Sequence, residues 1–220
     1  MNLPPKVFLS EIEKHSIFES IDDKFIDVNP VEYNEELFKG YKRIFIIGPQ
    51  RSGTTFTSKA LAETLNYRFV DEAEFDVVNF KKFKTLFKLE NLVVQAPAMT
   101  SKIHVLAGPE DLVVFMSRKW SDIVKSVHKK NGRISNWVYM KVMYEVEKQH
   151  YLSVDKNSEQ IYDAVVDKNS FYLNCFYSMW KNYQSKLIPN CFALDYQSMS
   201  KHPLWKDKTQ REHFHFKQTE

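Results

Sequence analysis

Residues 41–76 read YKRIFIIGPQRSGTTFTSKALAETLNYRFVDEAEFD, and the rest of the chain is arranged around them. Residues 43–47 form a short run of β-branched and aromatic side chains, which predicts a buried strand. A loop that contains glycine follows over residues 48–53. From residue 54 onward the pattern is helical, with apolar side chains on one face at Phe56, Ala60, Leu61 and Leu65. We therefore expect a strand, a glycine-bearing loop and a helix in direct succession.

The expected loop has the features of an anion-binding site. The first N–H groups of a helix have no partner within it, and the helix dipole places partial positive charge there. Gly53 lets backbone amides approach a phosphate closely. Arg51 adds a permanent charge that can bind one oxyanion through two hydrogen bonds. The sequence thus predicts a phosphate-binding loop.

The spacing between Gly48 and Gly53 matches that of the nucleotide-binding P-loop, G-x-x-x-x-G-K-[ST]. Thr54 stands where that motif has its lysine, which reaches the β- and γ-phosphates of ATP. The loop is therefore expected to bind a phosphate, and ATP is disfavoured as its ligand. Two alternatives stay open: a nucleotide-dependent kinase or NTPase with a degenerate P-loop, and a non-catalytic nucleotide-binding protein on the same fold.

The motif GPQRSGTTF at residues 48–56 resembles the 5′-phosphosulfate loop of sulfotransferases, P-[KR]-S-G-T-T, and especially the type seen in tyrosylprotein sulfotransferases. The resemblance covers residues 41–203. It implies a P-loop-NTPase-like sulfotransferase fold and the donor 3′-phosphoadenosine-5′-phosphosulfate (PAPS), whose product is 3′,5′-adenosine bisphosphate (PAP). It implies no metal. The loop residues that it places on the nucleotide are Arg51, Ser52, Gly53, Thr54, Thr55 and Phe56.

The resemblance also gives these residues roles. The amides of residues 52–55 would hold the 5′-phosphate, and Phe56 takes the position, usually Trp in the family, that contacts the adenine. Arg51 would neutralise the charge that develops on the leaving phosphate oxygen, which makes it a catalytic candidate. Phe56 has a structural interpretation as well, because packing of the loop helix on the core would use the same side chain.

A second motif follows the run of residues 111–116. Sulfotransferases carry an Arg at the end of such a strand and a Ser eight residues later, which together bind the 3′-phosphate. Arg118 and Ser126 have that spacing, and Asp122 lies between them as in the family. Neighbouring basic residues add positive charge; they are Lys125, Lys129, Lys130 and Arg133. Without the resemblance, the same pattern would indicate an ordinary capped helix with a basic face.

The general base is predicted among the acids that follow residues 67–70. In tyrosylprotein sulfotransferases a Glu soon after the second strand has this role, and Glu72 lies at the matching spacing of 21 residues from Arg51. Simpler cytosolic enzymes use a His after the third strand, but residues 94–97 contain none. Glu72 is therefore preferred. The remaining candidates, in order, are Glu74, Asp71 and Asp76, and then His104 as a distant alternative.

The rest of the chain alternates between predicted strands and predicted helices. Short apolar runs at 67–70, 91–95, 111–116 and 189–194 predict strands, and 80–88 and 171–186 predict helices. This order implies a mainly parallel sheet flanked by helices in one α/β domain over residues 1–220. Within it we expect a partly helical lead-in at 1–40, a family-like core at 41–203 and a basic tail at 204–220. Arg211 and Lys217 of the tail are candidates to close over the nucleotide.

Composition narrows the function classes. The chain has 220 residues, 43% of them hydrophobic, and a formal net charge of only +3, which argues against nucleic acid or an anionic membrane as a partner. It contains no apolar run of membrane-spanning length and no signal-peptide pattern, so a cytoplasmic location is expected. Cys175 and Cys191 are expected to be buried thiols, and no metal-binding cluster is present. The acceptor class stays open among small alcohols, phenols, saccharides, lipids and peptides.

Overall fold

The computed structural model describes residues 27–75, 80–100, 103–119, 122–123, 126, 176–177 and 180–205. Residues 1–26 of the expected lead-in and the expected basic tail from residue 206 onward lie outside the described residues, as does Cys175. In the described part of the chain, no helix combines the length and the apolar character that a membrane crossing requires.

A five-stranded sheet forms the centre of the described structure. Its order is β2-β3-β1-β4-β5, and every neighbouring pair is parallel. The strands are β1 (Arg43–Ile47), β2 (Arg68–Val70), β3 (Leu92–Gln95), β4 (Asp111–Ser117) and β5 (Cys191–Asp195). All five were expected from their apolar runs, and the observed bounds differ from the predicted ones by at most two residues at either end. The predicted α/β fold class is therefore confirmed.

Helical segments connect and cover the strands. They are η1 (Glu35–Phe38), α2 (Thr54–Leu65), α3 (Glu72–Phe75), α4 (Phe80–Thr85), η2 (Leu86–Lys88), η3 (Pro97–Met99), η4 (Ile103–Val105), η6 (Trp180–Gln184), α9 (Ser185–Leu187) and η7 (Gln197–Lys201). The helix predicted at 171–186 contains a π-helical stretch, η6, before its last turn in α9. The structure thus reproduces the predicted alternation of strands and helices.

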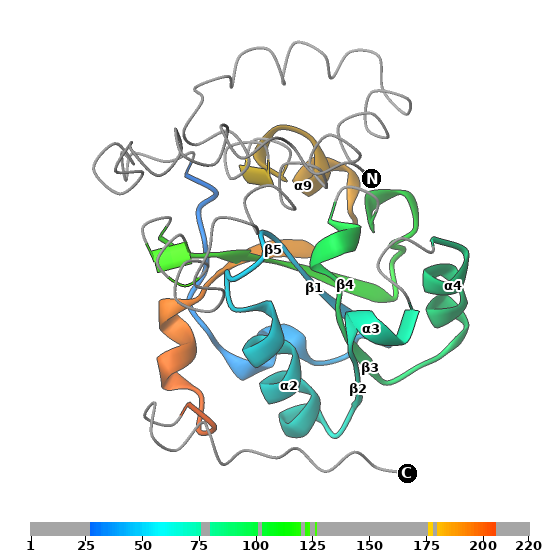
Figure 1. The fold of residues 1–220 in the computed structure, drawn as a ribbon, viewed down its shortest axis with the longest axis horizontal. Coiled ribbons are helices and arrows are strands. Elements are labelled where there is room, and N and C mark those ends of the chain that lie inside the picture. Colours follow the sequence, from blue (N-terminus) through cyan, green and yellow to red (C-terminus); the bar gives the residue numbers. More distant parts are fainter. Residues whose placement is uncertain are drawn as a thin grey trace, which may run out of the picture.

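Side chains of the central strand alternate between two layers of core. Phe45 and Ile47 belong to a buried cluster that includes side chains of α4 and η6, whereas Ile44 and Ile46 belong to a cluster with α2 and η7. Both faces of the sheet are covered, which is why β1 is an uninterrupted apolar run. Figure 1 shows α2 on one side of the sheet and the segment around α9 on the other.

The lead-in differs from its prediction. The expected lead-in is partly helical, but Val31 is extended and pairs with β5: its N–H donates to the Ala193 carbonyl (2.8 Å) and its carbonyl accepts from the Asp195 N–H (2.9 Å). The helix begins later because Asn34 caps η1, its Oδ1 accepting from the Glu36 N–H (3.1 Å). The lead-in therefore covers the β5 edge of the sheet through backbone hydrogen bonds.

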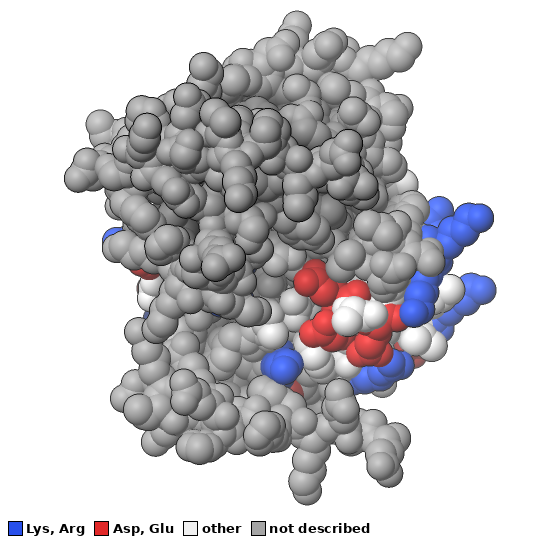
Figure 2. Space-filling model, in the orientation of Figure 1, with Lys and Arg blue, Asp and Glu red and all other residues white. Residues whose placement is uncertain are grey.

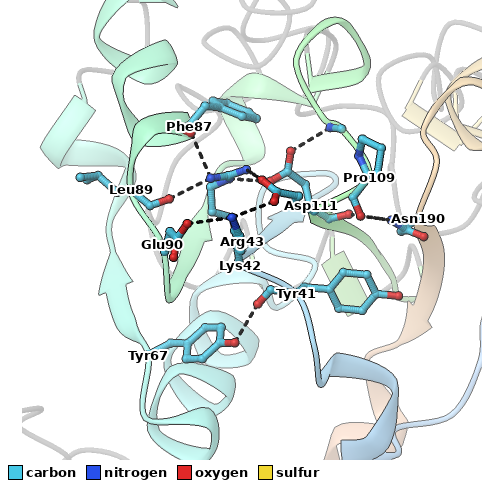
Figure 3. Close-up of polar contacts among 12 residues, drawn as sticks. Tyr41, Lys42, Arg43, Tyr67, Phe87, Leu89, Glu90, Pro109, Asp111 and Asn190 are labelled. Atoms are coloured by element: carbon cyan, nitrogen blue, oxygen red, sulfur yellow. Dashed lines mark hydrogen bonds and ion pairs between the residues drawn. The ribbon is translucent and has the colours of Figure 1, made fainter.

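A buried ion pair lies at the amino-terminal edge of the sheet. Arg43, at the start of β1, donates from Nε to Asp111 Oδ1 (2.5 Å) at the start of β4. Its Nη1 donates to the carbonyls of Phe87 (3.0 Å) and Leu89 (2.9 Å), and Figure 3 shows these groups converging on the guanidinium. The pair joins adjacent strands in register and lies at the edge opposite the loop.

Candidate functional site

The loop after β1 lies at a position in the sheet where ligands bind in open α/β folds. From β1 the chain passes to β2 and β3 on one side, and then to β4 and β5 on the other. The carboxyl ends of β1 and β4 therefore flank a topological switch point. Arg51 follows β1 and Arg118 follows β4, so two arginines stand on neighbouring strand ends at this point.

The loop itself has an unusual backbone. Gly48 (φ 121°), Arg51 (φ 69°) and Gly53 (φ 107°) all have positive φ, which is unfavourable for residues with a side chain. A Cβ on Gly48 would lie 3.1 Å from the Met116 carbonyl oxygen, so β4 packs closely against the loop. The Gly48 N–H donates to Thr100 Oγ1 (3.0 Å). The loop is thus fixed at its start by the segment that follows β3.

The amino terminus of α2 is open to an anion. Gly53 is its N-cap, no side chain caps the helix, and its first turn contains no acid. Ser52 differs from its prediction, because its N–H (3.1 Å) and its Oγ (2.7 Å) both donate to the Pro49 carbonyl. The amides left at the helix start are those of Gly53, Thr54 and Thr55. The Thr54 side chain is buried, so the position of the P-loop lysine points into the protein.

Arg51, Arg118 and Ser126 lie together beside this helix start. Arg51 Nε donates to Ser126 Oγ (3.2 Å), and Arg118 Nη1 donates to the Arg51 carbonyl (3.0 Å). Burial, and then the charge of Arg118, lower the pKa of the Arg51 guanidinium. Among the residues that the structure describes, no carboxylate lies within 4 Å of either guanidinium. Two cations without an acidic partner are an arrangement suited to an anionic ligand.

Two tyrosines that the sequence interpretation did not assign to the site hold Arg118. Tyr177 Oη accepts from the Arg118 N–H (2.9 Å) and donates to the Arg118 carbonyl (3.0 Å). The Arg118 guanidinium lies over the Tyr196 ring, 4.5 Å from its centroid. Tyr196 directly follows β5, the strand beside β4. Tyr177 is 59 residues from Arg118, and its contact arises only from the tertiary fold.

Phe56 packs among aromatic side chains at the same end of α2. Its ring meets Trp205 edge-on (5.1 Å between centroids), and Trp205 meets Tyr196 in a similar way (5.2 Å). These rings lie against the α2 face of the sheet. The geometry supports the packing role foreseen for Phe56, and its contact with an adenine stays a prediction.

The acids after β2 divide into two groups. Asp71 Oδ1 accepts from the Ala73 N–H (3.0 Å), and Glu74 Oε1 accepts from the Asp71 N–H (3.1 Å), which is a capping box for α3. Glu74 Oε2 also pairs with Arg68 Nη2 (2.6 Å). Asp71 and Glu74 are therefore engaged in local structure, whereas Glu72 has no part in this capping box. Figure 2 shows the acidic side chains gathered on the surface over α3.

Glu72 lies at the same edge of the sheet as the loop. It follows β2, which is separated from β1 by β3 alone. Two strand spacings of about 4.8 Å place the ends of β1 and β2 roughly 10 Å apart. One oxygen of its carboxylate, Oε2, is buried. The carboxylate and the loop therefore lie at the same edge of the sheet, two strands apart.

The remaining candidates are placed as follows. His104 lies in η4, on the connection from β3 to β4. Asp76, Arg211 and Lys217 lie outside the described residues. Cys191, in β5 as predicted, is half-buried, and burial raises its pKa to about 11. Within the described ranges, no group of three or more His, Cys, Asp or Glu residues is arranged to hold a metal ion.

Comparison with known proteins gives only weak similarity. No family model matches the chain, and no curated protein matches it. Among solved structures, the chain resembles shikimate kinase from Acinetobacter baumannii in complex with shikimate (13% identity, 72% of this chain and 87% of that one, TM-score 0.39). It also resembles deoxyadenosine kinase from M. mycoides with bound dCTP (14%, 77% and 95%, TM-score 0.40). An uncharacterized protein from Eubacterium ventriosum matches at 17% identity, over 70% and 88% of the two chains, with TM-score 0.37. Similarities of this size carry no argument about function.

Proposed function

We propose that the chain is a PAPS-dependent sulfotransferase that transfers a sulfuryl group to an acceptor hydroxyl or amine. The observation that carries this proposal is the pair Arg51 and Arg118. They flank an uncapped helix start and have no carboxylate partner within the described residues. The two phosphate-bearing ends of PAPS would supply the anions that such a pair lacks. PAPS supplies a sulfuryl group whose bond to the 5′-phosphate oxygen breaks as the acceptor atom bonds to sulfur.

The residues present fit this nucleotide. The amides of Gly53, Thr54 and Thr55 would hold the 5′-phosphate, and Arg51 would stabilise the charge left on its oxygen. Arg118, with Ser126, would bind the 3′-phosphate. Phe56 and the ring of Trp205 beside it offer an apolar surface for the adenine.

Glu72 is proposed as the general base that accepts the proton of the acceptor group. It lies at the ligand-binding edge of the sheet, and the hydrogen bonds of the neighbouring capping box are made by Asp71 and Glu74. A base must reach the acceptor directly or through one water, and Glu72 follows a strand end on the same edge of the sheet as the loop.

The alternative is a kinase or NTPase with a degenerate loop. It is disfavoured because the buried Thr54 offers no amine to the β- and γ-phosphates. In addition, the strands that flank β1 end without an acid: β3 ends at Gln95 and β4 at Ser117. Those strand ends therefore provide no carboxylate for a nucleotide-bound magnesium.

Mass spectrometry of acceptor pools tests the proposal. The purified protein is incubated with PAPS, EDTA and pools of alcohols, phenols, saccharides or peptides, and the products are searched for an added sulfuryl group with matching release of PAP. Transfer in EDTA supports the sulfotransferase. Phosphate transfer from ATP that depends on magnesium, with no transfer from PAPS, would replace it by the kinase alternative. Binding of PAP without any turnover would indicate a non-catalytic nucleotide-binding protein.

A further inference from the structure

Arg118 contacts the loop in two ways that anion binding alone does not require. Its Nη1 donates to the backbone carbonyl of Arg51 (3.0 Å). Its guanidinium carbon also lies over the Tyr196 ring, 4.5 Å from the centroid. The side chain therefore spans from the end of β4 to the loop that follows β1.

The Tyr196 ring in turn lies directly against the loop. A Cβ on Gly53 would be 2.1 Å from Cδ2 of this ring, so the ring fills the space beside the glycine. The Tyr196 N–H donates to the Ser117 carbonyl (2.8 Å), which joins the backbone of Tyr196 to the residue before Arg118. Arg118, Tyr196 and Gly53 thus form a continuous stack from β4 to the start of α2.

The loop needs such a restraint because Arg51 has a left-handed backbone, φ 69°, which a residue with a side chain adopts only when its surroundings hold it. The hydrogen bond from Arg118 acts on the carbonyl of that same residue. Arg118 is itself held at both backbone polar groups by Tyr177. Its Nε is buried and has no hydrogen-bond partner among the described residues, and a guanidinium has five donors, so donors remain for a ligand.

We infer that Arg118 is a positioning residue for the 5′-phosphate loop as well as a ligand of the second anion. It holds Arg51 and the start of α2 in the anion-binding conformation. Loss of its side chain therefore weakens binding even of nucleotides whose single phosphate is the 5′-phosphate. This inference rests on the proposed function for the identity of the nucleotide. The contacts between Arg118 and the loop are made within the protein itself.

Calorimetric titration separates the two roles. Dissociation constants for adenosine 5′-phosphate and PAP are measured for the wild type, Arg118→Ala and Arg118→Lys. If these contacts of Arg118 brace the loop, both variants should weaken the binding of adenosine 5′-phosphate by about tenfold, the effect of one hydrogen bond from a charged donor. The additional affinity gained from the 3′-phosphate should vanish in Arg118→Ala and be partly retained in Arg118→Lys, which keeps the charge and loses the planar fork. Unchanged binding of adenosine 5′-phosphate in both variants would overturn the inference.

Lys119→Ala is the matched control, because it removes one positive charge from an exposed neighbour in sequence. It should leave both dissociation constants within about twofold. Hydrogen exchange of the unliganded proteins gives a readout that needs no nucleotide. The Ser52 amide, bonded to Pro49, should exchange faster in Arg118→Ala than in Lys119→Ala. If the wild type binds neither nucleotide, the proposed function fails, and exchange still decides on the brace. Equal exchange in both variants would refute the brace.

Discussion

Gly53→Ala tests the loop geometry without any assumption about the ligand. The new Cβ would lie 2.1 Å from Cδ2 and 2.2 Å from Cε2 of Tyr196, at a residue whose φ is 107°. The backbone strain of a non-glycine residue there costs about 1–2 kcal/mol. Displacing the packed ring adds about 1–3 kcal/mol, as for other overpacked sites. We expect a total loss of roughly 2–5 kcal/mol in the free energy of unfolding.

Urea unfolding of Gly53→Ala and a matched control measures this loss. Gly40→Ala is the control, because Gly40 also has a positive φ (87°) but a Cβ there meets no atom within 4 Å. Gly40→Ala should therefore show the strain alone, about 1–2 kcal/mol. In addition, Tyr196→Ala should cost less in the Gly53→Ala background than in the wild type, since the clash is then absent. Equal losses for the two glycine variants, with additive Tyr196→Ala, would refute the proposed contact.

Three further predictions concern other parts of the molecule. Asp111→Asn leaves the buried Arg43 without its main partner and should lower the free energy of unfolding, measured in urea, by about 3 kcal/mol. Glu110→Gln, at an exposed partner of Arg43, should have a much smaller effect. Similar losses for the two variants would contradict this prediction. Burial lowers the pKa of His202, whose Nδ1 accepts from the Leu204 N–H (3.0 Å). Neutral His202 therefore contributes its full stabilisation above pH 6.5, and this stabilisation is lost as the pH falls below that value. The free energy of unfolding should be lower at pH 5.5 than at pH 8, and His202→Asn should reduce this difference. Glu72→Gln should lower kcat for sulfuryl transfer by on the order of a hundredfold with PAP affinity retained, and Glu74→Gln should be mild; the reverse pattern would move the base to Glu74.

The sequence predicted β1, the loop and α2 closely because each has a local signal. The apolar run Arg43–Ile47 requires burial on both faces, and the helical spacing from Thr54 onward specifies the next element. The sheet order follows less directly, since strand pairing depends on contacts between residues far apart in the chain. It is nevertheless compatible with the expected parallel arrangement.

The contacts within the candidate site could not be predicted from the sequence in the same way. No local sequence signal indicates that Arg51, which is not a glycine, has a left-handed backbone, or that the Ser52 N–H donates to the Pro49 carbonyl. The hold of Tyr177 on Arg118 links residues 59 positions apart. By contrast, the capping box of Asp71 and Glu74 follows the Asp-x-x-Glu spacing and could have been recognised, which would have separated these acids from Glu72 at once.

The most direct test of the central claim is a pair of calorimetric titrations of the wild-type protein, one with PAP and one with ATP and magnesium. Arg51 and Arg118 together with the open start of α2 suit two separate phosphates, and the buried Thr54 leaves the β- and γ-phosphates without an amine. We predict that PAP binds at least about tenfold more tightly than magnesium ATP, a difference of about 1.4 kcal/mol. Tighter binding of magnesium ATP than of PAP would contradict the sulfotransferase assignment.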